Sequence, residues 1–154
     1  MTCQAAVAPG AGHIRKLERA RALLESTPLS VTQLLARLGV GAVFFKSGMT
    51  KIASWEFTLM LFREEYRVPL LPTETAALLA TATELSMPVL LALGLFARLA
   101  TLPLLGMVVV IQLFVYPQSW AEHLTWVALL LLILTRGPGA FSLDRLIAPS
   151  LFSR

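Results

Sequence analysis

The sequence predicts an all-α integral membrane protein, built as a bundle of four transmembrane helices with an amphipathic interfacial helix between spans one and two. Four apolar stretches, at about residues 29–48, 73–96, 100–116 and 121–136, are each close to the length that crosses a bilayer. Hydrophobic residues make up 56% of the 154-residue chain and charged residues only 14%, which is too little polar surface for a small water-soluble domain. The lipid bilayer is therefore the first partner that we expect.

The distribution of charge predicts how the chain lies in the membrane. We expect one membrane domain at residues 29–147, flanked by a basic tail at residues 1–28 and a short tail at residues 148–154. The expected inner side carries Arg15, Lys16, Arg19, Arg21, Arg98, Arg136, Arg145 and Arg154, against Lys51, Arg63 and Arg67 on the other side. The positive-inside rule then makes both tails cytoplasmic. Because these basic residues are not gathered into one surface, we expect no nucleic-acid partner.

The spans have recognisable beginnings and ends. Thr27-Pro28 is typical of an N-cap and a first helical residue, and Thr73-Glu74 is a cap followed by an acidic first turn. Tight turns are expected at residues 94–98 and 116–120, and Gly137-Pro-Gly139 ends the fourth span. These short links predict that spans two, three and four run antiparallel as neighbours.

The longest loop, between spans one and two, carries a helical pattern of its own. Its apolar residues recur at steps of three and four, at Ile52, Trp55, Leu59, Phe62 and Tyr66. Charged residues such as Glu56 and Arg63 occupy other positions. We predict a helix that lies flat on the outer surface, either packed on the bundle or dipping into the lipid interface.

Two ionisable residues fall deep inside predicted spans, where such groups cost several kcal/mol unless they are paired or hydrated. Arg37 lies roughly 12 Å into span one from the inner side, and Glu84 lies roughly 16 Å into span two from the outer side, at a rise of about 1.5 Å per residue. In a hydrocarbon core about 30 Å thick, these depths nearly coincide. We hypothesise that Arg37 and Glu84 form a buried ion pair, which either fixes the register of the two helices or takes part in function.

A second polar layer is predicted near the outer ends of the spans. It comprises Lys46, Lys51, Gln112, Tyr116, Glu122, His123 and Trp126. We hypothesise that these side chains line one outer pocket. A histidine beside an acid and a lysine can exchange protons with a quinol or bind a small anion. Alternatively, each residue has a simple structural role, since lysines extend to the interface and tryptophans are favoured there.

Other chemistries have little support in the sequence. Only His123 lies near the membrane, because His13 falls in the first tail, and the single Cys3 has no partner for an intrachain disulfide. The five methionines do not recur at a ligand-like spacing. We therefore predict no metal site, and the sequence identifies no catalytic residues.

Several short motifs follow one another in a characteristic order. They are Arg37-Leu-Gly39, then Phe45-Lys-Ser-Gly48 with Lys51, then Glu84 with Gly94 and Arg98, and the ending Gly137-Pro-Gly-Ala-Phe-Ser-Leu-Asp144. Over about residues 30–147 the chain thereby resembles the DoxX family of small four-helix bacterial membrane proteins. Residues 63–72 and 115–120 resemble a proteobacterial subgroup that is encoded beside enzymes that oxidatively modify metal-binding peptides. The resemblance implies a bacterial inner-membrane protein connected with quinone-coupled sulfur oxidation, oxidative-stress complexes or detoxification.

Three functions remain open at this stage. The first is an accessory subunit that supports a redox, quinone-linked or metal-peptide system, with quinone as the candidate cofactor and the catalytic partner elsewhere. The second is a small permease or assembly factor, which needs an oligomer because four helices per chain are few for a pore. The third is a non-catalytic anchor that binds a soluble partner through Trp55–Tyr66. Quinone chemistry requires one cleft that is accessible from lipid, and transport requires polar groups from face to face.

Overall fold

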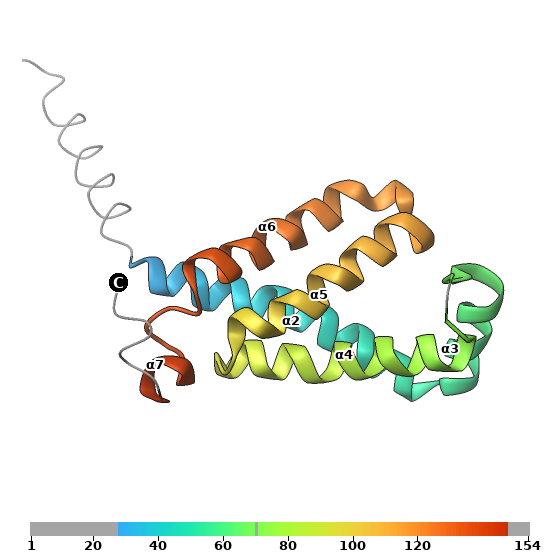
Figure 1. Cartoon of the computed structure of the whole chain (residues 1–154), viewed down its shortest axis with the longest axis horizontal. Helices are drawn as coiled ribbons and strands as arrows, with labels where there is room; N and C mark the ends of the chain where they lie inside the picture. The colour runs from blue at the N-terminus through green and yellow to red at the C-terminus, as the bar shows by residue number, and fades with distance from the viewer. Residues whose placement is uncertain (1–27, 70, 148–154) are drawn as a thin grey trace, which may run out of the picture.

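The computed structural model describes residues 28–69 and 71–147, and over these residues the fold is helical without strands. The long helices are α2 (Leu29–Ala53), α4 (Thr73–Leu93), α5 (Ala97–Val110) and α6 (Trp120–Arg136). Helix α2 packs against α4 and α6, and α5 packs against the same two helices, which closes a four-helix bundle (Figure 1). The predicted all-α membrane fold is confirmed. The predicted tails fall outside the described residues, apart from Pro28.

Three helical segments are long and apolar enough to cross a membrane: Leu29–Ala53, Thr73–Leu93 and Ala97–Val115. The first runs five residues past the predicted end at residue 48. Helix α6 has 17 residues and is about 26 Å long at the α-helical rise, which is near the lower limit for a span. Its crossing as a fourth span stays a prediction.

Shorter elements close the two ends of the bundle. At one end, α3 (Trp55–Leu61) and a π-helical turn, η1 (Phe62–Tyr66), follow α2, while a π-helical turn, η2 (Ile111–Val115), and a 3-10 turn, η3 (Pro117–Ser119), join α5 to α6. At the other end, α7 (Leu143–Ile147) follows α6. We refer to these as the α3 end and the α7 end, which lie at the right and left of Figure 1.

The predicted interfacial helix corresponds to α3 and η1, and its apolar face packs on the bundle. Phe62 is buried against Ala76 and Ala77 of α4, and Trp55, Leu59 and Tyr66 pack around this cluster. Ile52 differs from the expectation, because it lies in the last turns of α2 and is 48% exposed. The helix breaks at Ser54, so Ile52 does not share the face of the other four residues.

Packing on the loop segment shifts the register between α2 and α4. Ala76 and Ala77 in the first turns of α4 pack against Phe62 of η1, and residues farther along α4 face the end of α2. A Cβ atom on Gly48 would lie 2.9 Å from the Leu85 side chain and 3.0 Å from Cβ of Glu84. Nearer the α7 end, a Cβ atom on Gly41 would lie 3.6 Å from the carbonyl oxygen of Pro88. Glycine therefore lets these helix backbones approach closely, as is common between helices in membranes.

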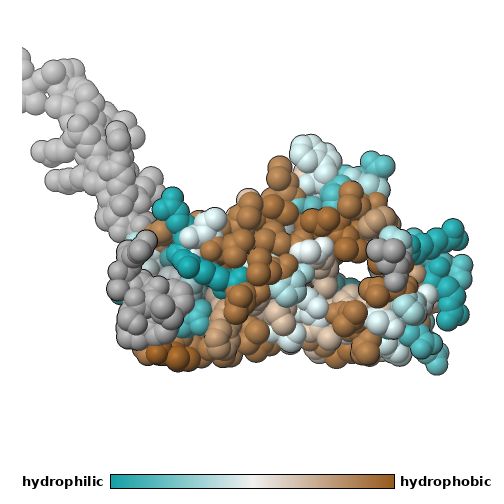
Figure 2. All heavy atoms as spheres, in the orientation of Figure 1, coloured by the Kyte–Doolittle hydropathy of each residue, from teal (hydrophilic) through white to brown (hydrophobic). Residues whose placement is uncertain are grey.

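The core and the outer surface are both apolar. Val40, Phe44, Leu91, Leu104 and Leu130 are at most 2% exposed and fill the middle of the bundle. Large apolar side chains such as Leu99, Leu113 and Leu78 are at least 60% exposed, and Figure 2 shows hydrophobic residues over most of the visible bundle surface. A helical bundle with an apolar outside is stable in lipid, where this surface needs no covering.

The chain after α6 folds back over the α7 end. The Gln33 amide donates to the carbonyls of Arg136 and Gly137 at 3.1 and 3.0 Å, and the Ala140 N–H donates to the Ser30 hydroxyl at 3.1 Å. These bonds hold the end of α6 beside the beginning of α2. Both therefore lie on the same end of the molecule.

Candidate functional site

A cavity of about 310 Å³ opens within the α3 end of the bundle, where Figure 2 shows the molecule hollowed. Helices α2, α4, α5 and α6 and the turns η1, η2 and η3 all contribute to its wall. The polar and aromatic lining residues are Ser47, Lys51, Phe62, Tyr66, Glu84, Tyr116, Ser119, Glu122, His123 and Trp126. The rest of the wall is apolar. A volume of this size holds a small organic ring.

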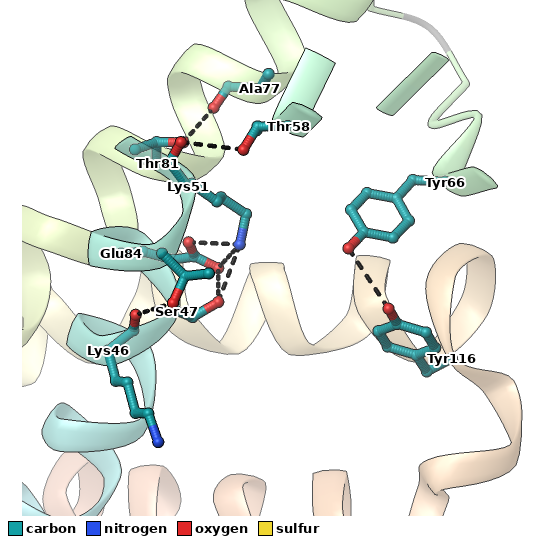
Figure 3. A network of polar contacts seen from close by, with 10 residues as sticks. Lys46, Ser47, Lys51, Thr58, Tyr66, Ala77, Thr81, Glu84 and Tyr116 are labelled. Carbon is teal, nitrogen blue, oxygen red and sulfur yellow. Dashed lines mark hydrogen bonds and ion pairs between the residues drawn. The ribbon is translucent and has the colours of Figure 1, made fainter. Parts of the chain in front are cut away.

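An ion pair between α2 and α4 forms one wall of the cavity. The ammonium group of Lys51 donates to the two carboxylate oxygens of Glu84 at 2.8 and 2.7 Å and to Oγ of Ser47 at 2.9 Å (Figure 3). Ser47 in turn donates to Glu84 at 3.2 Å. The Glu84 side chain is 3% exposed and that of Lys51 is 16% exposed. The three groups satisfy one another, and the two charges cancel.

Local sequence explains why Lys51 reaches Glu84. Ser47 and Lys51 are four residues apart, so they lie on the same face of α2. Between them, Gly48 brings α4 close enough for Glu84 to reach both. The buried Thr58 hydroxyl of α3 donates to the Lys51 carbonyl at 3.0 Å, which satisfies a backbone oxygen near the end of α2.

Two tyrosines lie across the cavity from the ion pair. Tyr66 is the last residue of η1 and Tyr116 follows η2, so each comes at the end of a π-helical turn, a feature that is frequent at functional sites. Their hydroxyl groups are 3.5 Å apart, which is a long hydrogen bond, and Figure 3 shows them pointing toward each other. Burial and the contact with Tyr116 raise the pKa of Tyr66 above its ordinary value. Tyr66 therefore keeps its proton and can donate it in a hydrogen bond.

His123 lines the same cavity and has a defined orientation. The Gln112 side-chain amide nitrogen donates to the Pro117 carbonyl at 2.9 Å, which leaves the Gln112 oxygen as the acceptor facing Nδ1 of His123 at 2.6 Å. His123 therefore carries a proton on Nδ1, and in the neutral ring Nε2 is the hydrogen-bond acceptor. Trp126 packs against His123, with ring centroids 5.1 Å apart.

The structure brings most of the predicted outer-pocket residues together. Lys51, Tyr116, Glu122, His123 and Trp126 line the cavity. Gln112 lies behind His123 and lines a separate groove between α5 and α6. Lys46 is exposed, and Figure 3 shows its side chain extending away from the Lys51–Glu84 pair.

The structure does not contain the hypothesised ion pair between Arg37 and Glu84. Within the described residues, Glu84 pairs with Lys51, while Arg37 donates to the Phe141 carbonyl near the α7 end. Arg37 lies against Gly94, and ten residues of helix, about 15 Å, separate Gly94 from Glu84. The depth estimate was wrong because it aligned span ends at residues 48 and 73, whereas the first turns of α4 pack beyond the end of α2.

Arg37 instead takes part in closing the α7 end. It is fully buried, and among the described residues its Nε and Nη1 atoms have no hydrogen-bond partner. The acidic residue that interacts with it electrostatically is Asp144. Asp144 accepts the backbone N–H groups of Phe96 and Ala97 at 2.7 and 3.1 Å and so caps the start of α5.

Sequence reasoning missed several residues of the cavity. It assigned Phe62 and Tyr66 only to the interfacial helix and did not consider Ser47. The signal for Ser47 was its spacing of four from Lys51. No group of three or more His, Cys, Asp or Glu side chains that could hold a metal ion occurs among residues 28–69 and 71–147.

Chemically, the cavity favours a neutral polar molecule over an anion. The charges of Lys51 and Glu84 cancel, and the other charged residue of the wall is the exposed Glu122, so the wall has no excess positive charge for an anion. The two phenols and His123 provide hydrogen-bond donors and an acceptor on the facing walls. Apolar side chains such as Met107 and Val110 supply contact area for a ring.

Comparisons with known proteins place the chain in a family. The sequence model of the DoxX family matches residues 32–117, which is more than half of the chain and includes Ser47, Lys51, Glu84 and both tyrosines of the cavity. Neither the curated proteins nor the solved structures include a match to this chain.

Proposed function

The chain belongs to the DoxX family, and from this premise we propose that it is an accessory membrane subunit that binds a quinone in the α3-end cavity for a redox system. The quinone ring occupies the cavity, and the oxidoreductase partner exchanges electrons with it. The single observation that carries this proposal is the facing arrangement of the neutral Lys51–Glu84 pair and the Tyr66, Tyr116 and His123 side chains around an apolar space.

The polar groups suit both redox states of such a ring. Quinone carbonyl oxygens accept hydrogen bonds, which the phenols of Tyr66 and Tyr116 can donate. Quinol hydroxyl groups donate hydrogen bonds, which Nε2 of neutral His123 can accept, since Nδ1 is committed to Gln112. Glu84 stays close enough to the ring, through Ser47 and Lys51, to exchange a proton with it by way of a short network.

An apolar layer argues against transport through a single bundle. Val40, Phe44, Leu104 and Leu130 fill the space between the Glu84 cluster and the α7 end and are at most 2% exposed. A permeation path requires polar or hydrated groups along its length. Among the described residues, the two polar regions are separated by this core, which favours a binding site over a passage.

The anchor function also has less support than the binding function. The predicted docking face of α3 and η1 is already used within the molecule, since Phe62 is buried against α4 and Tyr66 lines the cavity. The apolar side chains that this segment leaves exposed are Phe57 and Met60.

We propose further that the α7 end faces the cytoplasm in a bacterial inner membrane. The basic residues between 15 and 21 precede α2, and Arg98, Arg136 and Arg145 lie near the same end. The α3 end has a lower density of basic residues and also carries the acidic residues Glu56, Glu64 and Glu65. Short loops with an excess of Lys and Arg stay on the cytoplasmic side.

Binding of a short-chain benzoquinone to the purified protein, measured by calorimetric titration, tests the proposed function. We expect saturable binding that Tyr116→Phe weakens by about three- to tenfold, as the loss of one hydrogen bond implies. Lys51→Met is expected to weaken binding at least as much, because it disturbs the wall of the cavity. Absence of saturable binding to the unmodified protein would refute the proposal.

Lys46→Met is the matched control, because Lys46 lies five residues before Lys51 on the same helix but points away from the cavity. It removes the same charge and should leave binding unchanged. Equal effects of Lys46→Met and Lys51→Met would show that the net charge of the protein, and not the cavity, governs binding. Extraction in native lipid, followed by mass analysis of co-purified quinone and proteins, tests the redox partner.

A further inference from the structure

An apolar groove lies beside the α3-end cavity, between α4 and α5. This groove of about 190 Å³ shares the lining residues Phe62, Val68, Ala80, Met107 and Val110 with the cavity. Its other walls include Leu79 and Thr83 of α4 and Pro103 of α5. Because five residues line both spaces, the groove adjoins the cavity. We call it the α4–α5 groove.

The two adjoining spaces differ in polarity. The Lys51–Glu84 pair, the two tyrosines and His123 line the cavity, whereas all five shared residues are apolar. The α4–α5 groove adds a single polar side chain, Thr83. A site that is polar at one end and apolar at the other fits an amphiphile, with a polar head at the ion pair and an apolar chain beyond it.

The outer mouth of this groove faces the region that lipid occupies. Helices α4 and α5 are both membrane-span candidates, and Leu79 and Pro103 are exposed on their outer surfaces. Small residues on α4, namely Ala76, Ala80 and Thr83, leave room between the two helices. An apolar chain in this groove would pass directly into the bilayer.

We propose that the ligand is a lipid-borne amphiphile that reaches the cavity sideways from the membrane, with its chain in the α4–α5 groove. This inference rests on the proposed function and adds the class and the route of the ligand: a quinone that carries an isoprenoid chain rather than a water-soluble one. Head and chain then contribute separately to affinity. Blocking the groove should weaken the binding of a long-chain ligand and spare that of a chainless one.

Two other grooves on the bundle provide controls. One, of about 310 Å³ between α2 and α4, is lined by Leu38, Ala42, Phe45 and Ala92 among others and shares no residue with the cavity. The other, of about 390 Å³ between α5 and α6, includes Val127 and shares only His123 with the cavity. This groove is the rival route for the apolar chain, because it meets the cavity at His123, beside Gln112.

The test compares two benzoquinones with the same ring, one without a side chain and one with two isoprene units, in titrations of the full-length protein. We expect the second to bind more tightly to the unmodified protein. Thr83→Phe should weaken its binding by about tenfold, an effect equal to about 1.4 kcal/mol and comparable to the burial of two CH₂ groups. Binding of the chainless quinone should stay unchanged. Ala92→Phe, on the same helix, should change neither.

The outcomes separate this proposal from the proposed function. If neither quinone binds the unmodified protein, the proposed function fails and this proposal fails with it. If both bind and Thr83→Phe affects them equally or not at all, only this proposal fails. An effect of Val127→Phe in place of Thr83→Phe would assign the chain to the α5–α6 groove and also refute it. Should Thr83→Phe not fold, Leu79→Trp fills the same groove from an exposed position.

Discussion

Lys51 and Glu84 form one ion pair at the α3 end, but they differ in how deeply they are buried. Glu84 is 3% exposed in the middle of α4, so it cannot reach water without its partner. Lys51 is 16% exposed and lies near the end of α2, where a long side chain can extend to the interface. The loss of one partner therefore has a different cost from the loss of the other.

We predict that Lys51→Met destabilises the folded protein more than Glu84→Gln does. The first leaves a buried carboxylate with only Ser47 as a partner, a defect that costs roughly 3–5 kcal/mol when the charge has no other compensation. Glu84→Gln leaves Lys51 without its partner, but the lysine side chain can move toward water. Unfolding titrations in mixed micelles measure both free energies. A larger loss for Glu84→Gln would mean that Lys51 is the more deeply trapped charge.

Asp144 links α7 to the start of α5. Its carboxylate accepts two N–H groups at the start of α5 and lies near the buried Arg37. Asp144→Ala should therefore lower the free energy of unfolding by at least the roughly 1–2 kcal/mol of a lost helix cap. Arg145→Ala, at the exposed neighbouring position, is the control and should have little effect. Equal stabilities of the two variants would contradict this role for Asp144.

At the scale of the elements, apolar stretches predict helices well and their mutual register poorly. The predicted spans at about residues 73–96 and 121–136 correspond to α4 and α6 within a few residues, because hydrophobicity is a property of the local sequence. The level of Glu84 relative to α2 depends on where η1 packs, which is a tertiary contact. The Arg37–Glu84 hypothesis failed for this reason, and Ser47 and Tyr66 were missed as cavity residues.

The close approach of α2 and α4 leads to a prediction about two glycines of α2. At Gly48, a Cβ atom would meet Leu85 and Glu84 at about the minimum distance that real contacts allow, whereas at Gly39 no atom lies within 4 Å. Gly48→Ala should cost roughly 1–3 kcal/mol through overpacking. Gly39→Ala should be neutral or stabilise by up to about 1 kcal/mol through helix propensity. Thermal unfolding in detergent compares them, and equal melting temperatures would disprove the predicted contact.

For the whole molecule, the arrangement of the bundle determines how the chain crosses the membrane. Three helical segments have the length and composition of spans, which by themselves would put the two ends of the described chain on opposite sides. Helix α6 is shorter, but Gln33 and Ser30 bind the chain at residues 136–140. These bonds hold the end of α6 at the beginning of α2. Since the beginning of α2 and the end of α6 then share one end, we predict that α6 returns across the bilayer as a fourth span.

Labelling of single cysteines checks this topology. In a Cys3→Ser background, which removes the single native cysteine, Gln118→Cys lies at the α3 end and Ala140→Cys at the α7 end, both at exposed positions. With the α7 end in the cytoplasm, a membrane-impermeant maleimide should label Gln118→Cys in intact cells and Ala140→Cys only after permeabilisation. The reverse pattern would retain the four-span bundle and invert its orientation. Labelling of both sites from the same side would mean that α6 does not cross, and the bonds from Gln33 and Ser30 could not then form in the membrane.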